Sequence, residues 1–138
     1  MSTVSFEEGL HDLCQAHGLT AVYLFAPPAG GKAGAPSDAR VGLLFRDPMS
    51  PAEIAGLQPS LLPAFRDLLG IEGLQLVFLQ QAGPLLQYEG ILGRLLYSAD
   101  ATRRADLEER VVRDYLDFAF EMRLFDEELA EEIRSEVS

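Results

Sequence analysis

Residues 20–45 read TAVYLF APPAGGKAGAP SDA RVGLLF, which is two short apolar runs separated by a stretch of small residues. The runs Thr20–Phe25 and Arg40–Phe45 are rich in aliphatic and aromatic side chains, so each is predicted to be a β-strand. Pro, Gly and Ala dominate Ala26–Pro36 and leave almost no side chain that can pack, which indicates a loop. The length of the loop suits pairing of the two strands, so they are expected to be neighbours in one sheet.

Two helices flank this strand pair. Residues 5–17 open with a Ser-x-x-Glu capping box, carry apolar residues at helical spacing and close on His-Gly, where glycine supplies the left-handed residue that ends a helix. A second helix is predicted from Ser50-Pro51, again with a capping box. Pro59 and Pro63 interrupt that segment, so we expect either two short helices or one kinked helix that ends at Gly70.

The remaining segments continue the alternation of helices and strands. Leu74–Leu79 is predicted as a third strand, Leu85–Leu92 as a short helix and Arg94–Tyr97 as a small fourth strand. A long charged helix is predicted from Asp100 towards the C-terminus, because apolar residues recur there every three or four positions. This order predicts an α/β (α+β) fold in which helices cover a small mixed sheet of three or four strands.

The composition and net charge of the chain limit the classes of partner that are expected. The 138 residues suffice for one domain, 48% of them are hydrophobic, and the net charge is −11. Nucleic acid and anionic membranes both attract clustered positive charge, so neither is expected as a direct partner, whereas a basic protein is compatible. Cys14 is the only cysteine, which excludes an internal disulfide and a cysteine-rich metal site. No signal peptide or membrane-spanning run is recognisable, so the expected location is the cytoplasm.

Several segments in a fixed order resemble the minimal nucleotidyltransferase (MNT) family, a small branch of the DNA polymerase β-like nucleotidyltransferase superfamily. The similarity covers roughly residues 5 to 118, and the order and spacing of the segments carry it. The segments are the strand–loop–strand unit with Ser37-Asp38, and residues 74–79, 84–89, 93–97 and 112–118. The resemblance implies a nucleotidyltransferase-like sheet with the strands at 20–25 and 40–45 side by side.

In that family the first strand ends in a Gly-Ser pair, and the second begins within Ser-Asp-x-Asp. Two aspartates two residues apart point to one face of a strand, and a third carboxylate on a neighbouring strand joins them. Together the carboxylates hold two Mg²⁺ ions against a nucleoside triphosphate, while the Gly-Ser pair contacts its phosphates. The resemblance therefore implies transfer of a nucleotidyl group to an acceptor hydroxyl.

This sequence departs from the family pattern at nearly every chemical position. Ala26-Pro27 replaces the Gly-Ser pair, which removes a hydroxyl and a backbone donor. Asp38 matches the first aspartate, but Arg40 stands at the second position and Gln75 at the third. A guanidinium cannot ligate Mg²⁺, and an amide is a weaker ligand than a carboxylate. No catalytic residue, metal ion or cofactor is therefore expected, and the chain is interpreted as a degenerate family member, a pseudoenzyme.

Cofactor binding has two candidate residues, Ser37 and Arg40. Arg40 and Asp38 share one face of a strand and are expected to form a partly exposed ion pair. The alternative is that Arg40 grips a phosphate directly, without a metal ion. The lack of a backbone donor at Pro27 weighs against that alternative.

Two functions from different classes remain open. MNT proteins often pair with a small helical toxin of the HEPN class (higher-eukaryote and prokaryote nucleotide-binding), so the first is an antitoxin-like protein that acts by binding a HEPN-type partner. The acidic charge is compatible with covering a basic RNA-binding surface. The second is an active nucleotidyltransferase that uses Mg²⁺ and ATP, with Asp38, Asp47 or Glu53 replacing the missing carboxylates.

The C-terminal segment is expected to form an interface. Residues 1–118 make up the nucleotidyltransferase-like domain, and residues 119–138 form a helical extension that is part of the same domain or contacts another chain. Apolar residues continue into the extension among acidic ones, and some are expected to lack partners within the chain. A homodimer, or a heterodimer with a basic helical partner, would bury them. They are Phe120, Leu124, Phe125, Leu129 and Ile133.

Overall fold

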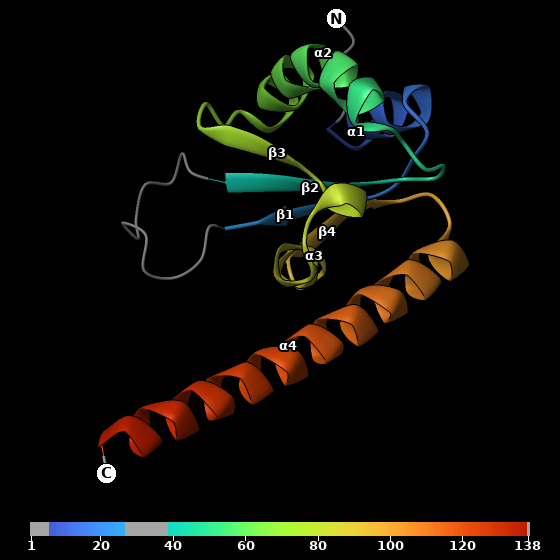
Figure 1. Cartoon of the computed structure of the whole chain (residues 1–138). Coiled ribbons are helices and arrows are strands. Elements are labelled where there is room, and N and C mark those ends of the chain that lie inside the picture. The colour runs from blue at the N-terminus through green and yellow to red at the C-terminus, as the bar shows by residue number, and fades with distance from the viewer. Residues whose placement is uncertain (1–5, 27–38, 138) are drawn as a thin grey trace, which may run out of the picture.

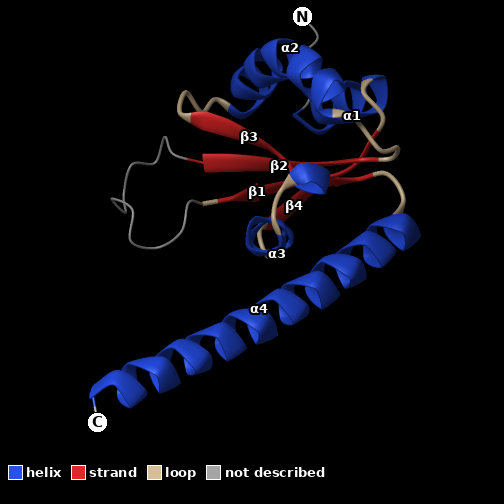
Figure 2. Cartoon of the chain, in the orientation of Figure 1, coloured by secondary structure: helices blue, strands red, loops and turns tan. Residues whose placement is uncertain are grey.

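The computed structural model describes residues 6–26 and 39–137, which form a mixed α and β fold (Figure 2). In chain order the elements are α1 (Phe6–Ala16), β1 (Leu19–Phe25), β2 (Ala39–Phe45), α2 (Pro51–Leu69), β3 (Leu74–Phe78), the 3-10 helix η1 (Leu79–Gln81), α3 (Pro84–Ile91), β4 (Arg94–Ser98) and α4 (Ala101–Val137). The predicted fold class and the long C-terminal helix are confirmed.

The four strands lie in the order β3-β2-β1-β4. β1 pairs antiparallel with both β2 and β4, which confirms that the two strands around the small-residue loop are neighbours. β2 and β3 are parallel, so the chain must cross over between them, and α2 makes that crossover on one face of the sheet. The sheet is therefore mixed, as the order of elements predicted.

Helices cover both faces of the sheet (Figure 1). On one face α1 and α2 bury Leu10, Cys14, Leu61 and Phe65 against the strands. On the other face lie α3 and the first part of α4, where Tyr23, Leu44 and Leu79 are buried. Because both faces of the two central strands are covered, nearly every residue in them is buried, which explains why their sequences are continuous apolar runs.

The ends of α2 form as the sequence predicts. The Ser50 hydroxyl accepts a hydrogen bond from the backbone N–H of Glu53 at 3.2 Å, and the Glu53 carboxylate accepts one from the backbone N–H of Ser50, also at 3.2 Å. Gly70 closes the helix with φ at +69°, a left-handed conformation that costs glycine nothing sterically. The capping box and the glycine stop are thus both confirmed.

The predicted interruption within α2 does not divide the helix. Pro59 and Pro63 lie inside one continuous helix, and both are exposed on its outer side. Leu61 and Phe65, on the inner side, have no exposed surface and anchor the helix on the sheet. The carbonyl groups that lose a helical donor to the prolines lie on the side facing water, so packing of the inner side outweighs the local loss.

The first half of α4 is fixed to the domain by polar and aromatic contacts. The hydroxyl of buried Tyr23 on β1 donates a 2.7 Å hydrogen bond to Glu108, which lies 3.3 Å from the guanidinium of Arg104. The rings of Tyr88 on α3 and Tyr115 on α4 stack with their centroids 3.9 Å apart. These contacts hold the helix across the face that α3 covers (Figure 1).

The second half of α4 extends away from the domain. All side chains from 120 to 135 are exposed, and they include Phe120 at 59% and Phe125 at 58%. In Figure 1 this part, coloured red, runs clear of the sheet and of α3. The apolar residues beyond Phe118 are thus exposed in the described part of the chain, in agreement with the prediction that some of them lack partners within it. None of the helices in the described ranges combines the length and apolar character needed to cross a lipid bilayer.

A glycine at the start of β4 allows a close approach to β1. A Cβ atom on Gly93 would lie 2.5 Å from the carbonyl oxygen of Leu24 and 2.8 Å from the Cβ of Phe25, and a backbone oxygen cannot move aside cheaply. Gly93→Ala should therefore lower the free energy of unfolding by about 1–3 kcal/mol. Gly56→Ala is the control, because Gly56 lies inside α2 with no atom near its added methyl group and should gain about 1 kcal/mol. Urea denaturation of both variants measures the two changes, and equal changes would contradict the close approach.

Candidate functional site

The sheet end that corresponds to the nucleotidyltransferase pattern lies where β1 finishes and β2 and β3 begin. Arg40, the second residue of β2, pairs with Phe25 on β1 and with Gln75 on β3. Ala26 follows directly after β1 and is exposed. Three of the positions singled out from the sequence, 26, 40 and 75, therefore lie at one end of the sheet, on adjacent strands.

Arg40 and Gln75 contact each other across the two parallel strands. The Nε atom of Arg40 donates a hydrogen bond to the Oε1 atom of Gln75 at 3.4 Å, and Gln75 is exposed while Arg40 is partly exposed. The two side chains thus occupy the face on which a pair of carboxylates could share metal ions. A fixed positive charge and a neutral amide are present instead, and they favour an anion over Mg²⁺.

Three further sequence positions, Pro27, Ser37 and Asp38, lie outside the described residues. The expected ion pair between Asp38 and Arg40 therefore stays a prediction. So does the candidate role of Ser37 in cofactor binding.

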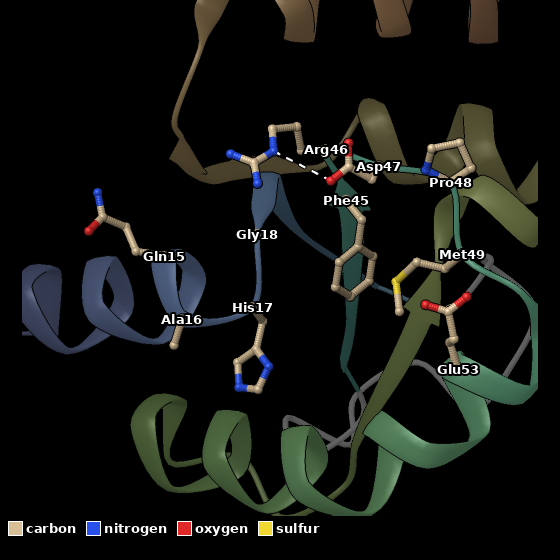
Figure 3. A pocket seen from close by; sticks show the side chains of 10 residues that line it. All are labelled: Gln15, Ala16, His17, Gly18, Phe45, Arg46, Asp47, Pro48, Met49 and Glu53. Carbon is tan, nitrogen blue, oxygen red and sulfur yellow. Dashed lines mark ion pairs between the residues drawn. The ribbon is translucent and has the colours of Figure 1, made fainter.

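The two carboxylates considered as replacement metal ligands lie at the other end of β2. Asp47 and Glu53 line a pocket of about 350 Å³ between the end of α1, the end of β2 and the start of α2 (Figure 3). Asp47 lies 3.7 Å from the guanidinium of Arg46, and Glu53 is held in the capping box. The seven residues of β2, at roughly 3.3 Å each, separate this pocket from the Arg40 end of the strand by roughly 20 Å. The use of Asp38, Asp47 or Glu53 as replacement metal ligands stays a prediction, because Asp38 lies outside the described residues.

No group of three or more His, Cys, Asp or Glu side chains within the described residues could hold a metal ion. His17 lines the pocket in Figure 3, and the ring of His11 meets that of Tyr97 edge-on at 6.1 Å. Cys14, on the inner side of α1, is fully buried in the core. All three residues take part in packing or line an open surface.

Solved structures provide the comparison for this geometry. A chain of the complex between the tri-AMPylated Shewanella oneidensis HEPN toxin and MNT antitoxin matches with a TM-score of 0.63 and 17% identity, covering 91% of this chain and 96% of that one. A toxin–antitoxin complex with AMP-PNP gives 0.63 and 17%, covering 90% and 98%. The MntA-HepT toxin–antitoxin complex gives 0.63 and 15%, covering 91% and 97%.

The chain has an MNT nucleotidyltransferase-like fold. At 15–17% identity the likeness establishes architecture and extends along almost the whole length of both chains. No protein-family profile and no curated protein sequence matches the chain, so the structural comparison carries the assignment of the fold. It confirms the MNT resemblance that the strand–loop–strand spacing indicated.

Sequence reasoning missed the contacts that set α4 on this MNT fold. Tyr23 and Glu108 are 85 positions apart, and an apolar strand gives no sign that one of its residues needs a polar partner. The guanidinium of Arg103 donates to the carbonyl oxygen of Arg46, which ties the start of α4 to the end of β2. Asp100 at the start of α4 accepts a hydrogen bond from the backbone N–H of Arg103 at 3.0 Å, a capping contact that a search for Asp before a helix would find.

Two buried acids predict that alkaline conditions weaken the fold. Burial raises the pKa of the Cys14 thiol from 9.0 to about 12, and burial followed by the hydrogen bond to Glu108 raises the pKa of Tyr23. The unfolded chain loses these protons first, so the stabilisation is complete below about pH 9 and is lost as the pH rises towards 12. Each group should contribute a fall of about 1.4 kcal/mol per pH unit within its window.

Urea denaturation at about pH 8 and about pH 10.5 tests this dependence. The Cys14→Ala variant should lose less stability between the two pH values than the unchanged chain, because the thiol then no longer contributes. Equal losses would show that the Cys14 thiol ionises as readily in the folded chain as in the unfolded one.

Proposed function

We propose that this chain is an antitoxin-like protein of the cytoplasm that acts by binding a HEPN-type helical protein and does not transfer nucleotides. The observation that carries the proposal is the contact between Arg40 and Gln75 on neighbouring strands. In the chemistry of the family, carboxylates on adjacent strands hold the metal ions. Here the same place is taken by a cation and an amide.

Electrostatics opposes catalysis at this end of the sheet. Two Mg²⁺ ions need several carboxylate oxygens close together, and Arg40 would repel both ions at contact distance. The register neighbours of Arg40 are Phe25 and Gln75, neither of which carries a carboxylate. Among the positions of the family motif, Asp38 is the one that carries a carboxylate in this sequence. A single negative charge is too little for two divalent cations.

A binding role agrees with the surface and with the comparisons. The net charge of −11 favours association with a basic partner, and the extension 119–138 exposes apolar residues that a partner could cover. The similar structures are complexes between toxins and antitoxins, one of them between a HEPN toxin and MNT antitoxin. We assign residues 1–118 to the MNT-like domain and residues 119–138 to its interface.

Incubation with radiolabelled ATP and Mg²⁺ or Mn²⁺, in the presence of a HEPN-type protein, tests the lack of activity. We expect no label on protein, and titration calorimetry should give a dissociation constant for Mg²⁺-ATP of about 1 mM or weaker. The matched control carries Ala26→Gly, Pro27→Ser, Arg40→Asp and Gln75→Asp, which restores the family residues. Labelling by the unchanged chain that Asp38→Asn abolishes would contradict the proposal.

That contradicting outcome would favour the second candidate function, nucleotidyl transfer from ATP to the partner. One observation supports this second candidate function: the toxin in a structurally similar complex is tri-AMPylated. In that case Mg²⁺ and ATP would be the cofactors, and Asp38, Asp47 or Glu53 would replace the missing carboxylates.

Growth rescue tests the binding role. The search for the partner starts with the reading frames on either side of the gene that encodes this chain. A HEPN-type protein from there should slow growth when expressed alone, and co-expression of this chain should restore it. Arg40→Ala should rescue as well as the unchanged chain, because the proposed neutralisation needs no nucleotide chemistry. Loss of rescue by Arg40→Ala would indicate that the end of the sheet at Arg40 takes part in neutralisation.

A further inference from the structure

An apolar seam runs along α4 from its packed half into its exposed half. The residues alternate by three and four positions, which is the spacing of the two core positions of a coiled coil. Tyr115 is half-buried and stacks on Tyr88 of α3. Phe118, on the same side of α4, is also half-buried, whereas Met122 and Leu129 are each 45% exposed. The residues of the α4 seam are Tyr115, Phe118, Met122, Phe125 and Leu129.

Acidic residues border the α4 seam. An acid directly precedes four of its members. Three of these acids recur every seven residues: Asp114 before Tyr115, Glu121 before Met122 and Glu128 before Leu129. These acids occupy a position that flanks the core of a coiled coil. Coiled coils carry at this position the charged residues that pair between helices. Asp126, directly after Phe125, stands on the opposite border. Within the described part of α4 the recorded ion pairs are Arg104–Glu108 and Arg134–Glu131, so salt bridges do not neutralise the borders.

This charge pattern opposes pairing of the seam with a second copy of the chain. In a parallel pair of helices Glu121 of one copy would face Asp126 of the other. In an antiparallel pair Glu121 would face Glu128. Either arrangement sets Glu121 against a like charge on the other copy, which is destabilising. The homodimer considered from the sequence is therefore disfavoured on this face.

A second apolar row on α4 has no such consistent border. It lies on another side of the helix, with members four positions apart, and is formed by Val112, Leu116, Phe120 and Leu124. Acidic residues and the arginines Arg113 and Arg123 both lie beside it. Because both positive and negative residues lie beside this row, it should not favour a partner of either charge. The row therefore serves as an internal control for the seam.

We propose that the exposed part of the α4 seam, Met122, Phe125 and Leu129, docks a helix of another protein that carries Lys or Arg beside its own apolar seam. The inference rests on the proposed function in that the chain acts by binding a protein. It adds the surface and the chemistry of the partner helix. The partner's cations meet Glu121, Asp126 and Glu128, while its apolar residues cover the seam.

Two synthetic helical peptides of roughly three heptads each are the probes. Both carry Leu and Ile at the core positions, and the bordering positions are Lys in one peptide and Glu in the other. Fluorescence anisotropy with the full-length chain should show the Lys peptide binding at least about tenfold more tightly, and the advantage should shrink at high salt. Glu121→Lys combined with Glu128→Lys should reverse the preference.

A pair of matched variants locates the site on the helix. Phe125→Ser in the seam should weaken binding of the Lys peptide at least about tenfold. Phe120→Ser in the second row removes the same side chain from the same helix at nearly the same exposure, 59% against 58%, and should leave binding unchanged. Circular dichroism confirms that both variants keep the helix content of the unchanged chain.

Several outcomes would overturn the inference: no binding of the Lys peptide, equal binding of both peptides, or equal weakening by the two Phe variants. A dimer of the full chain in light scattering that Phe125→Ser dissolves would assign the seam to a second copy. Failure of the proposed function looks different, because the Lys peptide would still bind while no HEPN-type protein did. Conversely, a HEPN-type protein bound equally by the Phe125→Ser variant would keep the proposed function and remove the seam from it.

Discussion

Ending the chain after Phe118 should reduce affinity for a HEPN-type partner at least about 100-fold, because the exposed seam is lost as a unit. The fold should survive, since the side chains from 120 to 135 are exposed and packing of α4 against α3 lies before the cut. We expect the free energy of unfolding to change by less than about 1 kcal/mol.

Biolayer interferometry measures the affinity, and thermal unfolding followed by circular dichroism measures stability. The full-length Phe120→Ser variant is the control, because it keeps the helix and the seam while losing one exposed aromatic residue. A shortened chain that binds its partner as tightly as the full-length chain would show that the domain, not its extension, makes the interface. A shortened chain that unfolds would show that residues 119–138 belong to the domain.

Leu79→Ala should lower the free energy of unfolding by about 2–5 kcal/mol. Leu79 has no exposed surface and is enclosed by Gly42 on β2 and Gly90 on α3. A Cβ atom at either glycine would come within 2.9 Å of the Leu79 side chain. Because neither glycine has a Cβ atom, there is room for the Leu79 side chain between β2 and α3. Leu79 thereby holds α3 on the sheet and belongs to the cluster against which Leu107 of α4 packs.

A double-mutant cycle separates this enclosure from an ordinary cavity. Gly90→Ala alone crowds Leu79, but in the Leu79→Ala background the new methyl group enters the vacated space. The two changes should be non-additive by about 1–3 kcal/mol, with the double variant more stable than the sum predicts. Chemical denaturation of the four chains gives the coupling energy. Additive effects would mean that α3 moves away to relieve the crowding.

The fold could be predicted because its elements are encoded locally. The apolar runs of β1 and β2 reflect burial on both faces, and the capping box at Ser50 and the stop at Gly70 act within a few residues. The interruption of α2 is predicted from the local effect of proline on a helix. Such a local argument omits tertiary packing, and in the structure the packing of Leu61 and Phe65 keeps the helix continuous.

The site was predictable only through resemblance. Nothing local links Arg40 with Gln75, because they lie 35 positions apart on strands whose parallel register is set by the whole sheet. The family pattern groups these two positions, and the structure shows their side chains joined by a hydrogen bond. The same long-range geometry places Asp47 and Glu53 at the opposite end of β2 from Arg40, since a few residues of sequence become the full length of a strand.

The unpacked end of α4 also has a consequence for how long the chain survives in a cell. Helix that is anchored by no tertiary contact unwinds at little cost, and proteases cleave backbone that is transiently unwound. A partner helix lying on the seam would have to dissociate before the same backbone opened. Copies of the chain in excess of their partner would then be degraded first, so the supply of the partner would set the amount of this protein that persists.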